Sequence, residues 1–396
     1  MGKEIELSTA IADIAAGPFG SNLKVECFVP SGFPIIDGAN LKGYKVTDNI
    51  TKFVTEEKAR SLSRSIAHRG DVIVTISGTI GQIAYIPEDS LYDEYLCSQR
   101  QFRVSFDSSM VYVPYLVFYF HTFEGQNKIL SFANQTGVPA LSQPLKNFKK
   151  IRLCLPSLQE QRRIASIVET INDKIENNIK INDNLQQQAF SVFDNLIANA
   201  ENNDYTVSDY AFLNPKRTLA KNQVARSIDM SQLSTSGAFP SGWEMKPFNG
   251  GMRFTNGDTL LARITPCLEN GKTAFIDFLD DGEVAFGSTE YIVLAPKNDT
   301  PPEMLYCLAR YPAFVDYAVK NMNGSSGRQR VSAETVGQYR LPLFDKHSLV
   351  LFKEVVSPMF LKMRYNSLEN MRLAELRDAL LPKLMSGEID VSDIQL

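Results

Sequence analysis

The sequence is poor in the residues and runs that build disulfide-bonded, metal-binding or membrane proteins. Its five cysteines are scattered and include no Cys-x-x-Cys pair, which excludes a disulfide framework and a zinc site and fits a reducing cytoplasm. Its three histidines form no His-Glu-x-x-His arrangement. No apolar run approaches the length of a membrane span, and the first residues, MGKEIELSTA, contain no apolar targeting core. We therefore expect a soluble, cytoplasmic protein that holds no metal and does not enter a membrane.

Sequence motifs of common enzymes are missing as well. The chain has neither a Gly-x-Ser-x-Gly elbow nor a Gly-x4-Gly-Lys-Ser/Thr phosphate loop. It also lacks the glycine-rich cofactor loop and the Asn-Pro-Pro-aromatic motif of a DNA methyltransferase, and Asn-Pro-Lys-Arg at 214–217 resembles the latter only superficially. The acidic pairs at 88–89 and 280–281 lie in turn-like contexts that are typical of solvated charge. The sequence predicts a protein that is not an enzyme and binds no cofactor of its own.

Length and charge set the next limits. A chain of 396 residues is long enough for two or three domains, and 44% apolar with 22% charged residues excludes global disorder. The formal net charge of −4 gives no overall attraction to nucleic acid. If DNA is a partner, the basic residues must therefore be gathered locally.

The chain repeats itself with a period close to half its length. RGDVIVTISGTIGQIAYIP (69–87) matches NGDTLLARITPCLENGKTAFI (256–276), where Gly-Asp opens an apolar strand and a glycine-bearing loop leads to a second one. Further matches follow in the same order: CSQRQFRV with GSTEYIVL, VPYLVFYF with PPEMLYCLAR, NQTGVPALS with NGSSGRQRVS, and IRLCLP with QYRLPL. A long helical pattern follows each half.

The repeat predicts an α+β protein in which two pseudo-repeated α/β domains alternate with two long helices. We assign residues 1–155 to a first domain and 156–200 to a first helix. Residues 201–343 then form a second domain, and 344–396 a second helix with a C-terminal tail.

The first long helix carries a heptad seam with two polar positions. The seam residues are Ile164, Val168, Ile171, Ile175, Asn178, Asn182, Leu185, Ala189, Val192 and Leu196. A shift of 184 residues gives Phe352, Val355, Met359, Lys362, Asn366, Glu369, Leu373, Leu376 and Leu380 in the second helix, where Pro358 is expected to kink or divide the seam.

Asn182 coincides with Asn366 under this shift. We predict that the two meet across an intramolecular helix pair and set its register, because a buried asparagine costs stability but fixes alignment. The alternative is a loosely packed, wetted stretch. A seam of about 33 residues corresponds to a rod of roughly 50 Å, which would hold two domains a fixed distance apart.

Basic and amide side chains recur at equivalent points of the repeat. Arginine and glutamine are the residue types that read guanine and adenine, and a Gly/Ser loop allows close approach to phosphates. The candidate DNA-contacting residues are Gln99, Arg100, Gln135 and Lys146 in the first domain and Lys272, Arg328, Gln329 and Arg330 in the second. The alternative for any one of them is ordinary solvated surface charge.

Three segments carry a resemblance to a known family. They are LPSLQEQRRIASIVETINDKI after the first domain, RITPCLENGKTAF in the second domain, and LAELRDALLPKLMSGEIDV near the end. With them, essentially the whole chain resembles the specificity subunit of a type I restriction–modification system. FDKHSL stands where the family more usually has Leu-Pro-x-Leu-x-Glu-Gln, so the start and straightness of the second helix are open.

The resemblance implies a non-catalytic subunit with two target recognition domains, each reading one half of a bipartite site in double-stranded DNA. The two helices would pair antiparallel as a coiled coil and set the gap between the half-sites. DNA methyltransferase subunits using S-adenosylmethionine, and restriction–translocase subunits using ATP and Mg²⁺, would assemble on this scaffold. Two rival interpretations remain open: a coiled-coil adaptor without DNA specificity, and an enzyme whose site is not recognisable from sequence.

Overall fold

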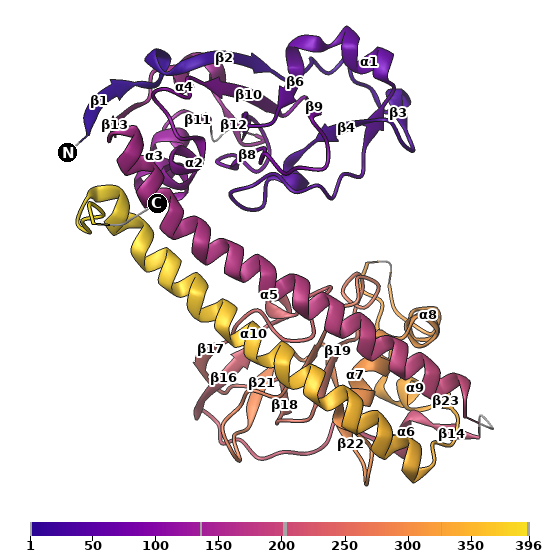
Figure 1. The fold of residues 1–396 in the computed structure, drawn as a ribbon. Helices are drawn as coiled ribbons and strands as arrows, with labels where there is room; N and C mark the ends of the chain where they lie inside the picture. Colours follow the sequence, from indigo (N-terminus) through magenta and orange to yellow (C-terminus); the bar gives the residue numbers. More distant parts are fainter. Residues whose placement is uncertain (1, 135–136, 201–203, 326, 394–396) are drawn as a thin grey trace. The chain divides into compact units, whose positions relative to one another are not determined.

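The computed structural model describes residues 2–134, 137–200, 204–325 and 327–393, and the chain divides into two compact units. Unit 1 contains residues 1–171 and 375–396, and unit 2 contains residues 172–374. Helices α5 (Leu158–Ala198) and α10 (Lys346–Ser386) each contribute residues to both units (Figure 1). The division predicted above treats the two helices as segments of their own, whereas their packing assigns each part of them to a globular unit.

The strands of unit 1 are β1 (Lys3–Glu6), β2 (Ile11–Ala16), β3 (Phe28–Val29), β4 (Phe33–Ile36), β5 (Phe53–Val54), β6 (Ile66–His68), β7 (Val72–Thr75), β8 (Ile83–Tyr85), β9 (Glu94–Cys97), β10 (Gln101–Phe106), β11 (Ala133–Asn134), β12 (Ala140–Leu141) and β13 (Arg152–Leu155). Its short helices are α1 (Glu56–Ser61), α2 (Val113–His121), α3 (Phe123–Leu130) and α4 (Pro144–Lys149).

The strands of unit 2 are β14 (Tyr205–Thr206), β15 (Ala211–Leu213), β16 (Val224–Ile228), β17 (Glu244–Pro247), β18 (Met252–Phe254), β19 (Thr259–Ala262), β20 (Thr273–Phe275), β21 (Ala285–Gly287), β22 (Tyr291–Pro296) and β23 (Arg340–Leu341). Its short helices are α6 (Val207–Tyr210), α7 (Pro302–Arg310), α8 (Pro312–Lys320) and α9 (Ala333–Gly337).

The two units are built on corresponding sheets, although the second sheet has five strands in unit 1 and four in unit 2. Unit 1 has a four-stranded antiparallel sheet with the order β2-β10-β7-β8, and unit 2 has β15-β22-β19-β20. A second sheet in each unit contains one parallel pair, β4 with β9 in unit 1 and β16 with β21 in unit 2. The pairings β1–β13 and β14–β23 also correspond. The predicted mixed fold of two pseudo-repeated domains is thus confirmed.

The four-stranded sheet of each unit is buried on both faces, which explains its apolar strands. In β7, Val72 and Val74 pack into the core on the helical side, while Ile73 between them packs toward the second sheet. In β19, Leu261 and Leu260 divide between two cores in the same way. Prolines in the first turn start α2 and α7, where the missing N–H costs no hydrogen bond.

Helices α5 and α10 pair antiparallel, as predicted. Within unit 2 the side chain of Asn178 contacts residues 369 and 370, and the side chain of Asn182 contacts residues 363, 366 and 367. Every predicted seam position of α5 is buried or half-buried. Helix α10 runs without interruption through Pro358, so this proline does not divide the second helix.

The seam predicted for α10 is partly wrong. Val355 and Leu376 are 47% and 48% exposed, and Lys362 is exposed as well. Phe352 and Asn366 are buried as predicted, but the other buried positions in this part of the helix are Val356, Phe360 and Met363. Phe360 packs against the rings of Phe275 and Tyr306 of the globular part, so α10 buries a face that meets α5 and the domain core together. Among the described residues, no helix is long and apolar enough to cross a membrane.

Candidate nucleic-acid interface

A frame of polar contacts that is repeated in both units lies beside the candidate residues. In unit 1, Asp37 caps the 3-10 turn at 38–40, and its carboxylate accepts a bond from Lys52 at 2.6 Å. In unit 2, Asp229 caps the turn at 230–232 and accepts from Lys246 at 2.8 Å. Burial raises the pKa of Asp37, but its bonds to Lys52 and the backbone outweigh burial and leave that pKa below its usual value.

The residue that reaches this turn from the neighbouring hairpin differs between the units. The Gln82 amide donates to the carbonyl of Gly38 at 3.0 Å, and the Lys272 ammonium donates to the carbonyl of Met230 at 2.7 Å. The backbone around Gln82 and Lys272 also pairs alike, Thr75 N with Gln82 O and Ala262 N with Lys272 O. Lys272, a predicted DNA contact, is therefore half-buried and has one donor engaged within the protein.

Unit 1 carries a groove of about 600 Å³ beside this frame. The groove is lined by the 3-10 turn, by the loop after β7 and by the loop between β9 and β10. Its lining residues are Leu23, Val25, Phe28, Ile35, Asp37, Gly38, Ala39, Lys52, Thr75, Ser77, Gly78, Thr79, Gln82, Ser98, Gln99, Arg100 and Gln101. Two predicted residues, Gln99 and Arg100, are thus brought together at one hollow of the surface.

Gln99 and Arg100 play different parts at this groove. Both are exposed, but the Gln99 amide donates to the carbonyl of Leu23 at 2.6 Å and so holds the loop that contains Leu23. The backbone of Arg100 is fixed, because its carbonyl accepts from Ile76 N at 2.6 Å. Among the described residues, the Arg100 guanidinium forms no hydrogen bond or ion pair. A fixed backbone with an unpaired donor group is an arrangement suited to contacting a ligand.

In unit 2 the predicted residues 328–330 lie on a hairpin. Asn323 and Arg330 exchange backbone hydrogen bonds, and Gln329 bonds to the backbone and hydroxyl of Thr265. Arg328 is exposed, and its carbonyl accepts from the Arg330 guanidinium at 3.1 Å. Arg328 is therefore presented at the surface, whereas Gln329 and Arg330 are half-buried and anchor the hairpin.

Arg330 is held by a carboxylate that sequence reasoning missed. Its guanidinium donates to both oxygens of Glu290, at 2.7 to 3.0 Å, and Arg263 lies 3.6 Å from the same carboxylate. The bonds from Arg330 hold the pKa of Glu290 below its usual range, so Glu290 is charged at neutral pH. Glu290 occupies the place in the repeat that Arg100 occupies in unit 1, because the carbonyls of both residues accept from the equivalent strand, at Arg263 N and Ile76 N.

Two predicted residues lie elsewhere or cannot be placed. Lys146 is exposed on α4 and does not line the groove. Gln135 lies outside the described residues. The structure therefore groups Gln99 with Arg100 and residues 328–330 with one another, and leaves Lys146 apart.

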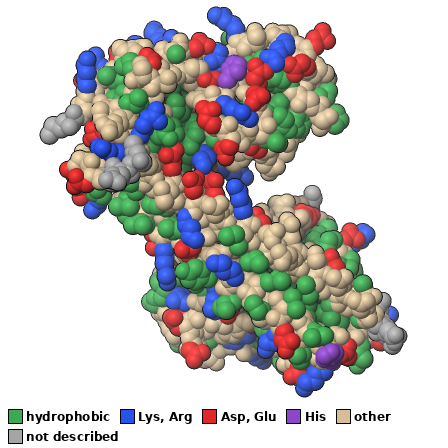
Figure 2. All heavy atoms as spheres, viewed as in Figure 1, with side chains coloured by type: hydrophobic (Ala, Val, Ile, Leu, Met, Phe, Trp, Pro, Cys, Tyr) green, Lys and Arg blue, Asp and Glu red, His purple; other side chains and the backbone are tan. Residues whose placement is uncertain are grey.

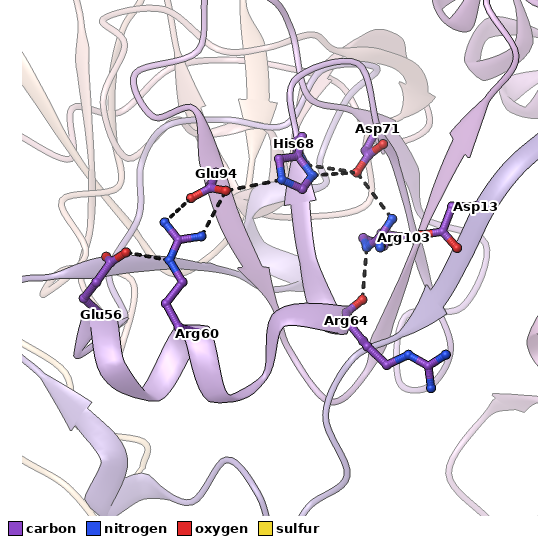
Figure 3. Close-up of polar contacts among 8 residues, drawn as sticks. All are labelled: Asp13, Glu56, Arg60, Arg64, His68, Asp71, Glu94 and Arg103. Atoms are coloured by element: carbon purple, nitrogen blue, oxygen red, sulfur yellow. Dashed lines mark hydrogen bonds and ion pairs between the residues drawn. The ribbon is translucent and has the colours of Figure 1, made fainter.

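A second set of charged residues in unit 1 is compensated internally (Figure 3). Arg60 pairs with Glu56 and Glu94, at 2.8 and 2.5 Å, and the His68 ring reaches Glu94 at 3.3 Å. Arg103 donates to Asp13 at 2.6 Å, and Asp71 lies between His68 and Arg103. The bonds from Arg60 and Arg103 lower the pKa values of Glu94 and Asp13. These contacts join α1 to strands of both sheets, and with two arginines against four carboxylates they leave no net positive charge.

The same network does not have the geometry of a nucleophilic site. The Ser105 hydroxyl bonds to Asp71, and the carboxylate of Asp71 separates it from the His68 ring. A histidine must contact the hydroxyl directly to activate it. Among the described residues there is also no cluster of histidine, cysteine or acidic side chains that could hold a metal ion.

The surface shows mixed charge and an exposed apolar stretch. Lys and Arg side chains are intermingled with Asp and Glu on the visible face of each unit (Figure 2). Helix α10 exposes Leu351, Val355, Leu361 and Tyr365 by 47 to 61%, and Figure 2 shows hydrophobic side chains at the surface of unit 2. The visible surface therefore shows no extended region of one charge, and exposed apolar side chains gather on α10.

The asparagines of the helix pair form a polar layer in unit 2. Asn366 is fully buried and donates to Asn182 at 2.8 Å, and Asn182 donates to the carbonyl of Met363 and the hydroxyl of Ser367, both at 3.3 Å. Asn178, also buried, donates to Glu369 and Asn370 at 2.7 and 2.8 Å. The contact between Asn182 and Asn366 is thus present, and its role in setting the register stays a prediction.

Sequence reasoning missed the Asp–Lys frame and Glu290. A usable signal existed in the sequence, because an apolar run ending in Ile-Asp precedes both turns, as IIDGAN at 35–40 and SIDMSQ at 227–232. The matched segments CSQRQFRV and GSTEYIVL place Glu290 opposite Arg100, but nothing in the sequence indicates how Glu290 is paired. Its partner Arg330 is 40 residues away, and only the fold brings the two side chains together.

Residues 29–187 match the family model described as the type I restriction modification DNA specificity domain. The MjaIX specificity subunit of the type I restriction enzyme from Methanocaldococcus jannaschii is 21% identical and aligns with 97% of this chain and 93% of its own. The corresponding HindI subunit from Haemophilus influenzae is 22% identical and aligns with 78% of this chain and 84% of its own.

A crystal structure has the same fold along the full length. It is the S subunit of a type I restriction–modification system from M. genitalium, with a TM-score of 0.59 and 14% identity. The superposition covers 97% of this chain and 96% of that one. The arrangement of two repeated units and paired helices is therefore that of a solved protein.

Proposed function

This chain belongs to the specificity subunits of type I restriction–modification systems, and we propose that it reads a bipartite sequence in double-stranded DNA. Unit 1 would read one half-site and unit 2 the other. Specificity subunits are the non-catalytic components of such systems, so the chemistry on DNA falls to other subunits. The chain itself would supply the sequence contacts and the scaffold.

The observation that carries this proposal is that both units share one frame of polar contacts but carry different residues beside it. Asp37 with Lys52 and Asp229 with Lys246 hold equivalent turns, while the equivalent positions beside them carry an exposed Arg100 and a half-buried Glu290. Two domains with one framework and different contact residues are what a protein needs to read two different short sequences in the same manner.

The gap between the half-sites would be set by α5 and α10. Each is an uninterrupted helix of 41 residues, which corresponds to about 60 Å at 1.5 Å per residue. One turn of DNA advances about 34 Å, so helices of this length are long enough to set a separation of one turn or more. The polar layer at Asn182 and Asn366 would keep the two helices in one alignment.

The partners would be methyltransferase subunits that modify adenine with S-adenosylmethionine, with restriction–translocase subunits that use ATP and Mg²⁺. The exposed apolar side chains of α10, Leu351, Val355, Leu361 and Tyr365, offer a surface for such a subunit. Removing apolar side chains there should weaken assembly without changing the sequence that is read.

The test is a genome-wide map of methylated adenines in a host without methylation of its own. The chain is expressed with its methyltransferase subunit, and each of the two is also expressed alone. A two-part motif with a fixed gap, seen only with both, is the expected result. A stable complex that methylates without such a motif would contradict the proposal and favour the adaptor interpretation.

A further inference from the structure

The groove of unit 1 contains one charged group that the protein does not compensate. Its charged lining residues are Asp37, Lys52 and Arg100. Asp37 and Lys52 bond to each other at 2.6 Å, so their charges cancel. Arg100 remains, and among the described residues its guanidinium has no hydrogen-bonding partner. The groove therefore presents a single cationic fork with all its donors available.

The backbone that carries the Arg100 side chain is fixed by hydrogen bonds. The Arg100 carbonyl accepts from Ile76 N, and the Arg100 N–H donates to the Ser98 hydroxyl at 3.4 Å. The guanidinium lies over Gly78, whose φ of +89° is strained for any residue with a side chain. Gly78 N also bonds to the carbonyl of Pro139, which fixes this loop to the next hairpin. The backbones of Arg100 and Gly78 are thus fixed by hydrogen bonds to Ile76, Ser98 and Pro139.

At the equivalent position of unit 2 the side chain is already paired within the protein. Glu290 stands in the place of Arg100, and both of its oxygens accept bonds from Arg330. Arg330 comes from the hairpin strand, where unit 1 has the small residue Ala140 in the same pairing with the neighbouring loop. A guanidinium that is paired on its fork with a carboxylate has few donors left for a base. The two positions therefore differ in chemistry, an unpaired arginine in unit 1 and a paired glutamate in unit 2, although their backbones correspond.

We propose that Arg100 reads one guanine of the first half-site through its O6 and N7 in the major groove, and that Glu290 removes this reading from unit 2. Arg donates two parallel bonds to the guanine edge, the pairing that best uses an unpaired fork. This inference rests on the proposed function, because it presumes that unit 1 contacts DNA.

The first experiment compares methylation motifs of the intact complex. Arg100→Ala should lose the guanine at one position of half-site 1, with discrimination at that position falling about 5- to 150-fold. Half-site 2 and the gap should not change. Arg100→Lys should keep a weaker preference, because an ammonium can donate to the same acceptors but lacks the planar fork that matches the guanine edge. Lys3→Ala, on β1 and outside the groove, is the matched control for the loss of a positive charge.

The second experiment changes the DNA instead of the protein. Binding of the complex is measured on duplexes with 7-deazaguanine or inosine at each guanine of half-site 1. The wild-type complex should lose affinity with 7-deazaguanine at one position, because N7 is absent, and tolerate inosine, which keeps both O6 and N7. The Arg100→Ala complex should not distinguish 7-deazaguanine from guanine there.

The outcomes separate this inference from the proposed function. A bipartite wild-type motif whose guanines are all retained by Arg100→Ala would overturn the role of Arg100 and leave the proposed function intact. The same holds if no 7-deazaguanine position matters. A wild-type complex without any bipartite motif would overturn both. Because the Arg100 side chain contacts no partner in the described protein, the thermal midpoint of Arg100→Ala should match that of wild type.

Discussion

The side-chain amide of Asn366 donates to the side-chain oxygen of Asn182 at 2.8 Å across the α5–α10 pair, at a site where Asn366 has no exposed surface. The remaining acceptor atoms nearby are not all satisfied, since the side-chain oxygens of Asn366 and Asn178 are buried without a partner. A polar layer of this kind is costly when it is only partly bonded, and it favours the one alignment in which its bonds can form.

Replacing one asparagine of this pair should therefore cost more than replacing both. Asn182→Leu leaves the Asn366 amide buried without its acceptor, for which we expect a loss of about 1–3 kcal/mol. The double variant Asn182→Leu with Asn366→Leu should recover part of this loss, because no unpaired amide remains. Urea unfolding of the four proteins of this double-mutant cycle is the measurement. Additive losses would indicate that the two side chains do not act as a pair.

Shortening both helices should change the gap and leave the half-sites alone. Deleting seven residues from α5 and seven from α10, on the unit 1 side of the polar layer, removes about 10 Å of helix. This corresponds to roughly three base pairs at 3.4 Å each. Seven residues are close to two whole turns, so each helix keeps its facing side to within about 20°. Methylation mapping should then give the same two half-sites with a shorter gap, and altered half-sites with an unchanged gap would contradict the model.

Replacing Lys146 or Arg328 should affect DNA binding differently from replacing Arg100 if these two residues contact phosphates and not bases. Both are exposed, and neither lines the groove. Replacing either with Ala should weaken binding to all DNA sequences alike and lower the slope of log affinity against log salt by about 1. Salt titrations with a cognate and a non-cognate duplex measure this. A change at a single position of the motif would instead identify a base contact.

The stability of unit 1 should decrease as the pH is lowered, because the pKa of the His121 side chain is depressed in the folded protein. Burial lowers the pKa of this side chain, and its Nε2 donates to the carbonyl of Ile83 at 2.8 Å. As pH falls, the unfolded chain binds its proton first, near pH 6.5. The stabilisation is complete above this value and is lost as pH falls toward the folded-state pKa. The melting temperature of wild type relative to His121→Gln should therefore decrease from pH 7.5 to pH 5.5, and parallel curves would contradict this role.

Periodicity and position made parts of the fold predictable. Gly-Asp before two apolar strands, and proline before two apolar helices, are local signals that do not depend on the rest of the chain. The heptads of α5 were read correctly because Ile164, Val168 and Ala189 repeat with the period of a buried helix face. These local signals placed the elements, and the order of the repeat predicted that the two units share one fold.

The buried face of α10 was not predictable in the same way. Sequence reasoning assigned Val355 to the seam by analogy with α5, yet Val355 is exposed and Val356 is buried. Helix α10 packs against the domain core as well as against α5, so its buried face is rotated relative to a simple two-helix seam. The periodicity of apolar residues along α10 does not indicate which positions face α5 and which face the domain core.

The candidate site, like the fold, was only partly predictable from the sequence. The sequence alone placed residues of DNA-reading type in loops of both repeated halves, because residue type and order are local properties. The expectation that they recur at equivalent points is wrong, since Glu290, Ala140 and Gln82 stand opposite Arg100, Arg330 and Lys272. Only the tertiary structure decided which of them are available. It paired Arg330 with Glu290 and Lys272 with a backbone carbonyl, and left the Arg100 side chain without a partner among the described residues. The physical reason is that the free energy of a charged group depends on the groups the fold brings within hydrogen-bonding distance, and those are distant in sequence.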